Sequence, residues 1–342
     1  MMQEGLNKIM RSKNKVLIII IILMLVLIAF MSAWIVRRGM VIYEAKQEEI
    51  RRMTEEICRQ EDLLGKTAEK AAEAFEDAEI ASHVYSHRGT DGFYEHSFKA
   101  YDEAIEAGSH NIEQDLVLSA DGVLFVSHDL NASGMTGVNA SYSSMTATKI
   151  DSLKTKAGFK VLRLSEVFDR YGRDINYIIE LKTSDDTTIK AFEKIVDEYG
   201  FQDIITVQST NTDVLAQLER KYPDMPKLLV CKSQQMFNSS LEMPHVDIIS
   251  VAINRGLMTA GNCEAAHAHD KLFSAWTLSS ESSIRNAIDM NVDTYFTNDT
   301  PLALSLEREY GLEKRAELNS EKSGYSGIEK SNDNIGREDS EG

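Results

Sequence analysis

The sequence predicts an α/β protein, a (β/α)8 TIM barrel preceded by a transmembrane helix and a helical stalk. Three observations lead to this prediction. An uncharged segment of 21 residues lies near the N-terminus, a charged segment without proline follows it, and about 230 residues then alternate short apolar runs with helical patterns. The 342 residues carry a formal net charge of −17 and are 43% hydrophobic. This composition can bury a core, which excludes a wholly disordered chain, and the acidity argues against nucleic-acid binding.

The uncharged segment, 16–36, predicts a single-pass anchor in the cell membrane. As a helix it would measure about 31 Å, enough to cross the hydrocarbon core of a bilayer. A buried core helix and a cleaved signal peptide are the alternatives, but the apolar region of a signal peptide is shorter, about 7–15 residues. The basic tail 1–15 carries four Lys or Arg, and five follow the segment within 37–52. Positive residues normally stay on the cytoplasmic side, but four against five hardly favours either orientation. Because a short basic tail resists translocation, we expect the N-terminus inside and the bulk of the chain outside the cytoplasm.

Residues 37–82 are rich in Glu, Lys, Arg and Ala and predict a charged helical stalk. Ile50, Ile57 and Leu64 recur every seven residues, which is typical of a weak coiled-coil seam. The pattern is compatible with a solvated single helix and with a homodimer through the stalk. In the dimer, Cys58 would be well placed for an intermolecular disulfide. At the other end, 313–342 consists mainly of Ser, Asn, Gly and charged residues, which predicts a disordered tail.

The remaining segment, 83–312, predicts the barrel. Helical patterns at 98–105, 186–199, 280–290 and 302–310 lie between apolar runs and are followed by helix-stop signals such as glycine. Strands are expected at 84–87, 112–118, 124–128, 177–182, 204–208, 227–231, 248–253, 272–277 and 294–297.

Nine strands are one too many for an eight-stranded barrel. The turn Ser119-Ala120-Asp121-Gly122 is short and contains Asp-Gly, which joins antiparallel strands, whereas a parallel crossover needs a dozen or more residues. The run 124–128 is therefore expected to be the return arm of a hairpin, and eight parallel strands remain. A doubly wound open sheet is the alternative, but the chain has no glycine-rich nucleotide motif to support it.

Two of the expected strands carry charges on one face. In 112–118, Glu113 and Asp115 alternate with apolar residues, and Glu180 and Lys182 do the same in 177–182. If the apolar positions face the helices, the charges point into the barrel mouth, where three carboxylates are costly without a compensating cation. All-oxygen ligation favours a hard ion, so the sequence predicts a Mg²⁺ or Ca²⁺ site. A solvated strand edge is the alternative interpretation.

Two histidines stand at strand ends next to these charges. His87 ends the first strand and is followed by Arg88-Gly89, and His128 ends the hairpin arm. A histidine titrates near neutral pH, so a pair can both take and give a proton. A single histidine more commonly has a structural role. His87 and His128 are candidates for acid–base chemistry because the carboxylates are expected to lie close to them.

The motifs together resemble the signature of the glycerophosphodiester phosphodiesterase family, over 83–312. The first five elements fall in order within 43 residues: His87-Arg88-Gly89, Glu95-His96-Ser97, Glu113-x-Asp115, Asp121-Gly122 and His128-Asp129. The later ones are similar in kind and order: Glu180-Leu181-Lys182, Ala275-Trp276-Thr277 and Thr297-Asn298-Asp299-Thr300-Pro301. Two positions depart from the family pattern. Glu95-His96-Ser97 stands where members usually have Glu-Asn-Thr, and Gln208-Ser209 stands where an aromatic residue often follows the fifth strand.

The resemblance implies a TIM barrel with its site at the carboxyl end of the strands, and it implies a role for each candidate. His87 and His128 would be the acid–base pair, and Glu113, Asp115 and Glu180 the metal ligands. The remaining candidates would serve the substrate: Arg88 and Lys182 would hold phosphate oxygens, Trp276 would line the alcohol side, and Glu95 would support the metal or the substrate hydroxyls.

The expected function is metal-dependent hydrolysis of glycerophosphodiesters to glycerol 3-phosphate and an alcohol. The attacking oxygen can be water or the substrate's own glycerol hydroxyl. Two alternatives keep the chemistry and change the substrate, to lysophospholipids or to polyglycerolphosphate (teichoic acid) polymers. A third alternative is an inactive barrel that acts as a membrane-tethered interaction module, against which the complete set of His, Glu, Asp and Lys residues argues.

Overall fold

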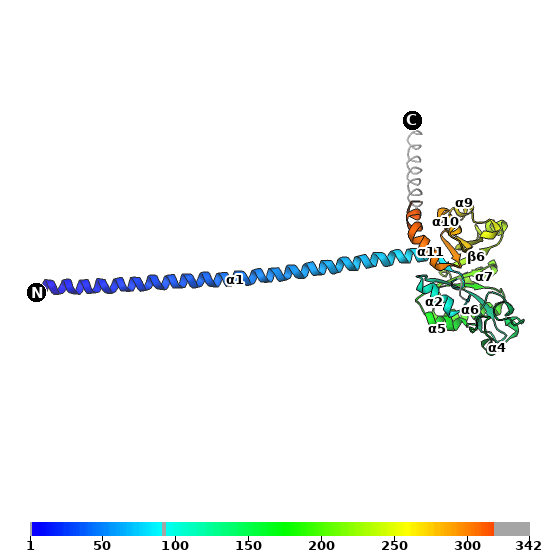
Figure 1. Cartoon of the computed structure of the whole chain (residues 1–342), viewed down its shortest axis with the longest axis horizontal. Helices are drawn as coiled ribbons and strands as arrows, with labels where there is room; N and C mark the ends of the chain where they lie inside the picture. Colours follow the sequence, from blue (N-terminus) through cyan, green and yellow to red (C-terminus); the bar gives the residue numbers. More distant parts are fainter. Residues whose placement is uncertain (1, 91–93, 318–342) are drawn as a thin grey trace, which may run out of the picture. The chain divides into compact units, whose positions relative to one another are not determined.

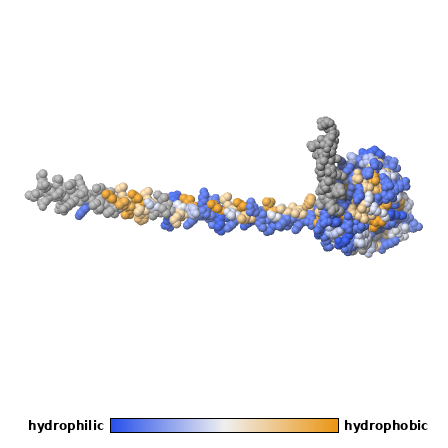
Figure 2. All heavy atoms as spheres, turned by 90° about the horizontal axis from the view of Figure 1, so that it is seen from above, coloured by the Kyte–Doolittle hydropathy of each residue, from blue (hydrophilic) through white to orange (hydrophobic). Residues whose placement is uncertain are grey.

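The N-terminal part of the molecule is one helix. The computed structural model describes residues 2–90 and 94–317, which fall into two units, Met1–Ala74 and Phe75–Gly342. Helix α1, Met2–Ser82, runs without a break (Figure 1). By length and composition it is a candidate membrane span: its most apolar 18-residue window has a mean hydropathy of 1.8, and none of that window is buried. Exposed apolar side chains gather along this stretch (Figure 2), whereas a core helix of a soluble protein would bury them.

The stalk part of α1 carries its charges in pairs one helical turn apart. Arg51 contacts Glu48 and Glu55, and Lys66 contacts Asp62. Such exposed pairs contribute little to stability, because water and salt screen them. The helix continues through Gly65, and the apolar seven-residue row stays exposed, with Ile57 at 54% and Leu64 at 71%. The row is thus available to a partner, and the homodimer stays a prediction.

The second unit contains the closed barrel that the sequence predicts. The strands follow the sheet order β1-β9-β8-β7-β6-β5-β4-β2-β3, and a further pairing of β1 with β2 closes the ring. All pairs within the ring are parallel. The strands are β1 (Val84–Ser86), β2 (Asn111–Leu118), β3 (Leu124–Val126), β4 (Asn176–Leu181), β5 (Ile205–Ser209), β6 (Lys227–Cys231), β7 (Ile248–Ala252), β8 (Leu272–Leu278) and β9 (Thr294–Thr297).

Strand β3 is the ninth strand and lies outside the ring. It pairs with β2 in antiparallel register, with Val117 opposite Phe125. Gly122 takes a φ of +80° in the connecting turn, and Asp121 accepts a hydrogen bond from the Ser119 hydroxyl. These observations confirm the predicted hairpin, which reduces the count to the eight strands of a TIM barrel.

Helices cover the outside of the ring. The predicted helix at 186–199 coincides with α6 and ends at Gly200, which has a φ of +67°. The helices after α1 are α2 (Phe98–Glu106), α3 (Ser133–Thr136), α4 (Ala147–Asp151), α5 (Leu164–Tyr171), α6 (Asp186–Tyr199), α7 (Thr212–Lys221), α8 (Gln234–Ser240), α9 (Ala260–His267), α10 (Glu281–Asp289) and α11 (Thr300–Leu306). Between and after these helices lie short 3₁₀ turns, η1 (Tyr142–Ser144) and η2 (Ile253–Arg255), and a π-helical turn, η3 (Glu307–Gly311).

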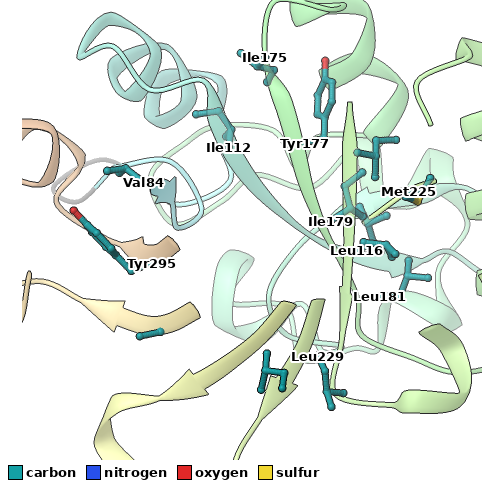
Figure 3. Close-up of a cluster of buried hydrophobic side chains, with 14 of the residues drawn as sticks. Val84, Ile112, Leu116, Ile175, Tyr177, Ile179, Leu181, Met225, Leu229 and Tyr295 are labelled. Atoms are coloured by element: carbon teal, nitrogen blue, oxygen red, sulfur yellow. The ribbon is translucent and has the colours of Figure 1, made fainter. Parts of the chain in front are cut away.

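Two separate apolar clusters set the direction of the strand side chains. The larger cluster lies between strands and helices and includes Ile112 and Leu116 of β2 and Tyr177 and Ile179 of β4 (Figure 3). A smaller cluster within the ring contains strand residues such as Leu228, together with Tyr85, Ile178, Val230, Ile248 and Phe296. Because strand side chains alternate, the outward cluster turns the charged residues of β2 and β4 inward, as the sequence analysis expects.

The helical structure continues to Glu317, so the first five residues of the predicted tail, 313–317, are helical. Arg315 explains the difference. Its guanidinium is buried and forms two bonds with the Glu307 carboxylate, of 3.0 and 2.8 Å, and a third with the Val292 carbonyl at 2.8 Å. The barrel domain therefore includes this segment, and the rest of the predicted tail, 318–342, lies outside the described residues.

Candidate active site

A small cavity of about 80 Å³ opens at the carboxyl end of the barrel strands. Every predicted site residue except Glu95 borders it. The lining residues are His87, Arg88, Glu113, Asp115, His128, Glu180, Lys182, Gln208, Val230, Lys232, Trp276 and Phe296. They come from the ends of β1, β2, β4, β5, β6, β8 and β9 and from the hairpin arm, so the ring closure gathers residues that are up to about 200 positions apart.

Three carboxylates form the centre of the cavity. Glu113 and Asp115 come from β2, and Glu180 lies directly opposite Asp115 in the parallel register of β4. Each offers one oxygen, and these oxygens lie within 4.8 Å of one another. Asp115 and Glu113 are almost completely buried, at 0% and 3% exposure. A hard divalent cation with oxygen ligands fits this donor set, and these three residues could hold it.

The carboxylates disturb one another because they are crowded and buried. Burial and the neighbouring Asp115 charge raise the pKa of Glu113 to about 7, and the same two causes raise the pKa of Glu180 to about 7. Burial would also raise the pKa of Asp115, but a hydrogen bond with His96 holds it well below its usual range. A site with this much negative charge out of water favours a cation among the three oxygens.

Two basic side chains lie against these acids. Lys182 Nζ is 2.8 Å from both Asp115 Oδ1 and Glu180 Oε2. Arg88 Nε lies 3.4 Å from Asp115 Oδ2, and its Nη1 donates to Glu95 Oε2 at 2.7 Å. Glu95 itself is half-exposed at the rim and is not one of the three clustered carboxylates. In the described structure Glu95 therefore contacts Arg88, while its predicted support of a metal stays a prediction.

The turn after β1 explains the His87-Arg88-Gly89 motif. Arg88 has a φ of +61°, and its backbone N–H donates to Glu113 Oε2 at 3.0 Å. Gly89 has a φ of +106°, and a Cβ there would come within 2.6 Å of the Ala100 Cβ on α2. Glycine is the residue that fits this close approach. The turn thereby places His87 Nε2 3.8 Å from Glu113 Oε2 and the Arg88 guanidinium against Asp115 and Glu95.

The two predicted histidines differ in their surroundings. His87 Nδ1 lies 2.6 Å from Asn298 Oδ1, and burial together with the Arg88 charge lowers the pKa of His87 to about 4. His128 is 41% exposed, and its Nδ1 lies 3.0 Å from Asp129 Oδ1. Burial and the Lys182 charge lower the pKa of His128 as well. Both rings therefore tend to be neutral at pH 7 in the absence of bound anions.

Trp276 borders the cavity beside Phe296 and also packs against the apolar cluster inside the ring. Its indole N–H is buried and has no hydrogen-bond partner among the described residues. Trp276 is therefore part of the apolar core and also stands at the cavity wall. A ligand in the cavity could accept a hydrogen bond from its buried indole N–H.

The model of the glycerophosphoryl diester phosphodiesterase family matches residues 87–302, which contain every residue that lines the cavity. The chain belongs to this family. Membership makes it a phosphoric diester hydrolase that acts on glycerophosphodiesters, and it confirms the resemblance found in the sequence.

Individual relatives agree with the family assignment. The chain is 25% identical over 253 residues to a glycerophosphodiester phosphodiesterase of Bacillus subtilis, an alignment that covers 66% of this chain and 86% of the relative. It is also 25% identical over 164 residues to a human lysophospholipase D, covering 44% and 51% of the two chains.

Solved structures show the same fold. A glycerophosphodiester phosphodiesterase from Agrobacterium tumefaciens matches with a TM-score of 0.58 and 22% identity, covering 66% of this chain and 99% of that one. A phosphodiesterase from Oleispira antarctica, solved with the product sn-glycerol-3-phosphate, matches with a TM-score of 0.58 and 19% identity, covering 65% and 95%.

The structure adds three polar residues that the sequence analysis did not assign to the site. Gln208 Nε2 donates to Glu113 Oε1 at 2.8 Å, and Asn298 bonds to His87. His96 is completely buried, with Nε2 2.9 Å from Asp115 Oδ2 and Nδ1 3.0 Å from the Tyr101 hydroxyl. All three stand in or next to the quoted motifs, so their positions were visible in the sequence while their partners were not.

Proposed function

We propose that the chain hydrolyses glycerophosphodiesters to glycerol 3-phosphate and an alcohol with a divalent cation, Mg²⁺ or Ca²⁺, at Glu113, Asp115 and Glu180. The observation that carries this proposal is the convergence of three carboxylates and two histidines on one cavity. Membership of the family supports the reaction class. When bound, the cation would offset the negative charge that develops on the phosphoryl oxygens.

The basic residues bind the phosphate in this proposal. Arg88 offers a planar fork and Lys182 a point charge, both at the cavity wall. Their present partners are the acids of the same site, chiefly Asp115. An anionic phosphodiester can compete for these donors once the carboxylates have a cation of their own.

The histidines move the protons. His87 and His128 each hold Nδ1 against an oxygen, Asn298 Oδ1 and Asp129 Oδ1. The proton is exchanged at Nε2, which in His87 lies 3.8 Å from Glu113 Oε2, beyond hydrogen-bonding distance. One histidine takes the proton from the attacking oxygen as the new P–O bond forms. The other gives a proton to the leaving alkoxide as the old P–O bond breaks. The attacking oxygen belongs to water or to the substrate's glycerol hydroxyl, and in the second case water then opens the cyclic phosphodiester.

Single substitutions test the acid–base pair. His87→Ala and His128→Ala should each lower kcat by about 10²–10⁴. His110→Ala, at an exposed histidine outside the cavity, is the matched control and should leave kcat unchanged. The pH–rate profile of each weakened variant assigns the roles, because the base variant loses the acid limb and the acid variant loses the alkaline limb. Turnover near wild type in both variants would contradict the mechanism.

The identity of the alcohol is a further part of the proposal. The human relative named a lysophospholipase D favours lysophospholipids as a second candidate, and the candidate membrane helix would keep the enzyme near such lipids. Detergent-solubilised full-length protein should be assayed on glycerophosphocholine and lysophosphatidylcholine, with Mg²⁺, Ca²⁺ or a chelator. Loss of activity in the chelator supports the metal site, and the ratio of the two rates separates the substrate classes. Absence of both metal binding and hydrolysis would favour the inactive interaction module.

We propose that the candidate span of α1 anchors the protein in the cell membrane with the barrel outside the cytoplasm. Protease added to intact cells should then degrade the barrel, and protection until lysis would contradict this orientation. For the homodimer, exposed Cys58 offers a direct readout. A disulfide-linked dimer on a non-reducing gel, abolished in Cys58→Ser, supports a paired stalk, whereas a monomer only argues against it.

A further inference from the structure

Two hollows lie beside the catalytic cavity, along the carboxyl ends of β4, β5 and β6. The first, of about 440 Å³, lies between the loops that follow β4 and β5, and the second, of about 570 Å³, lies between the loops that follow β5 and β6. Lys182 borders both the cavity and the first hollow, while Thr210 and Asn211 border both hollows. The three spaces are therefore consecutive, and we call the two hollows the polar groove.

The lining of the polar groove is rich in hydroxyl and amide groups. Its hydroxyl side chains include Thr183, Ser184, Ser209, Thr210, Ser233 and Ser239. Among the lining residues, all of which the structure describes, the apolar side chains are Leu181 and Met236. Such walls offer hydrogen bonds to a polyhydroxylated ligand and little apolar surface to an acyl chain.

Lys232 stands where the cavity meets the groove. It borders the cavity directly after β6, and the next residue, Ser233, borders the second hollow. Arg88 and Lys182 are paired with carboxylates of the site, whereas no described carboxylate forms an ion pair with the exposed Lys232. Its ammonium is thus available to an anion on the ligand and would repel a cationic one.

The one carboxylate that borders the groove, Asp185, is engaged by local hydrogen bonds. Asp185 caps the N-terminus of α6, where it accepts from the Thr188 backbone N–H and from the hydroxyls of Thr187 and Thr188. The negative charge of Asp185 is therefore directed at the helix end. It weakens, but does not cancel, the positive character that Lys232 lends to the other end of the groove.

A more apolar hollow of about 330 Å³ lies nearby, beneath the β2–β3 hairpin, with Leu118, Leu130 and Tyr142 in its wall. It shares Thr183 and Asp185 with the polar groove but shares no lining residue with the catalytic cavity. The apolar wall therefore borders the polar groove and not the catalytic cavity.

We propose that the polar groove binds the part of the substrate beyond the scissile phosphate, and that it takes an anionic, hydroxyl-rich alcohol such as a further glycerol phosphate unit. A quaternary ammonium alcohol or a long acyl chain fits it poorly. This inference rests on the proposed function, because it names the substrate class of the same catalytic cavity. Lys232 is the specificity-determining residue: it pairs with the second phosphate, while the histidines and the carboxylates of the cavity carry the bond-breaking chemistry.

Kinetics of the full-length protein in detergent test the inference. The substrates are a two-phosphate oligomer of glycerol phosphate, glycerophosphocholine and lysophosphatidylcholine. Wild type should have the highest kcat/KM on the oligomer. Lys232→Met should lower kcat/KM on the oligomer about tenfold or more relative to its effect on glycerophosphocholine, the value of one charge-assisted bond. Lys190→Met, at an exposed lysine on α6 outside the groove, is the matched control and should change neither.

A second variant tests the groove itself. Gln235 is exposed at the second hollow, and Gln235→Trp should obstruct the oligomer while glycerophosphocholine turnover stays unchanged. Equal losses on all substrates in Lys232→Met, an unaltered oligomer rate in both variants, or a preference of wild type for lysophosphatidylcholine would each overturn the groove assignment. In each of those cases the wild-type protein still hydrolyses diesters, so the proposed function stands. A wild-type protein inactive on every diester would instead contradict both the proposed function and the role of the groove.

Discussion

Replacement of Gln208 by Met should weaken metal binding without unfolding the barrel. Gln208 is 2% exposed, and its amide donates to Glu113 Oε1 across 2.8 Å. In the β4–β5 register it lies opposite Glu180, so the amide touches one proposed metal ligand and flanks another. Methionine is unbranched and similar in volume, which keeps the packing cost below about 1.5 kcal/mol.

The magnitude follows from the lost hydrogen bond. A bond to a charged group contributes about 1.5–3 kcal/mol. At about 1.4 kcal/mol for each factor of ten, this corresponds to a 10- to 100-fold weaker affinity, the range seen when residues that support metal ligands are removed. The pKa of Glu113 is already raised to about 7. Loss of a donor to the carboxylate raises it further, so a larger fraction of Glu113 is protonated at neutral pH and cannot bind a cation.

The assay is the dependence of activity on Mg²⁺ or Ca²⁺ concentration, with calorimetric titration of the metal alone as a second readout. The half-saturating concentration should rise 10- to 100-fold, and kcat at saturating metal should remain close to wild type. A higher pH should recover part of the affinity, because it deprotonates Glu113. Gln202→Met, at an exposed glutamine, is the control. An unchanged half-saturating concentration, with Gln208→Met still folded, would refute the reasoning that Glu113 binds the metal.

Two further predictions concern stability. Arg315→Met leaves the buried Glu307 carboxylate without its guanidinium and should lower the unfolding free energy by about 3–5 kcal/mol in denaturant titrations. The double variant with Glu307→Gln should recover part of this loss. A loss below about 1 kcal/mol would contradict the buried pair. The second concerns pH: hydrogen bonds with Asp293 and Cys263 raise the pKa of His267 to about 9, above the unfolded value of about 6.5. Its stabilisation is therefore full below pH 6.5 and lost as the pH rises through 9, so His267→Gln should lower Tm more at pH 6 than at pH 9.5, and an equal drop at both would show that the ion pair is not responsible.

Local sequence patterns were sufficient to predict most of the barrel. Alternation of apolar and charged residues placed Glu113 and Asp115 on the inner face of their strand, and the structure sends the opposite parity, Ile112 and Leu116, into the outer core. The short Asp121-Gly122 turn distinguished the hairpin from a ninth barrel strand. Both inferences succeed because the period of a strand and the geometry of a tight turn depend on neighbours in the chain.

The C-terminal boundary shows where composition misleads. Residues 313–317 look like the polar tail that follows them, but Arg315 reaches the carboxylate of Glu307 and the carbonyl of Val292. A charged residue in a polar stretch predicts solvent exposure unless its partner is known. The Val292 carbonyl lies 23 residues away, between α10 and β9, so the sequence pattern could not reveal that Arg315 is buried.

Spacing, periodicity and motif were enough to predict the barrel, the inward charges, the pair of candidate histidines and the reaction family. Which further side chains complete the site depends on how distant strands meet. The parallel register brings Gln208 onto Glu113 across 95 residues, and ring closure brings Asn298 onto His87 across 211. Closure also opens the polar groove beside Lys232. These contacts follow from how eight strands meet around a ring, a property of the assembled barrel that no local stretch of the chain carries.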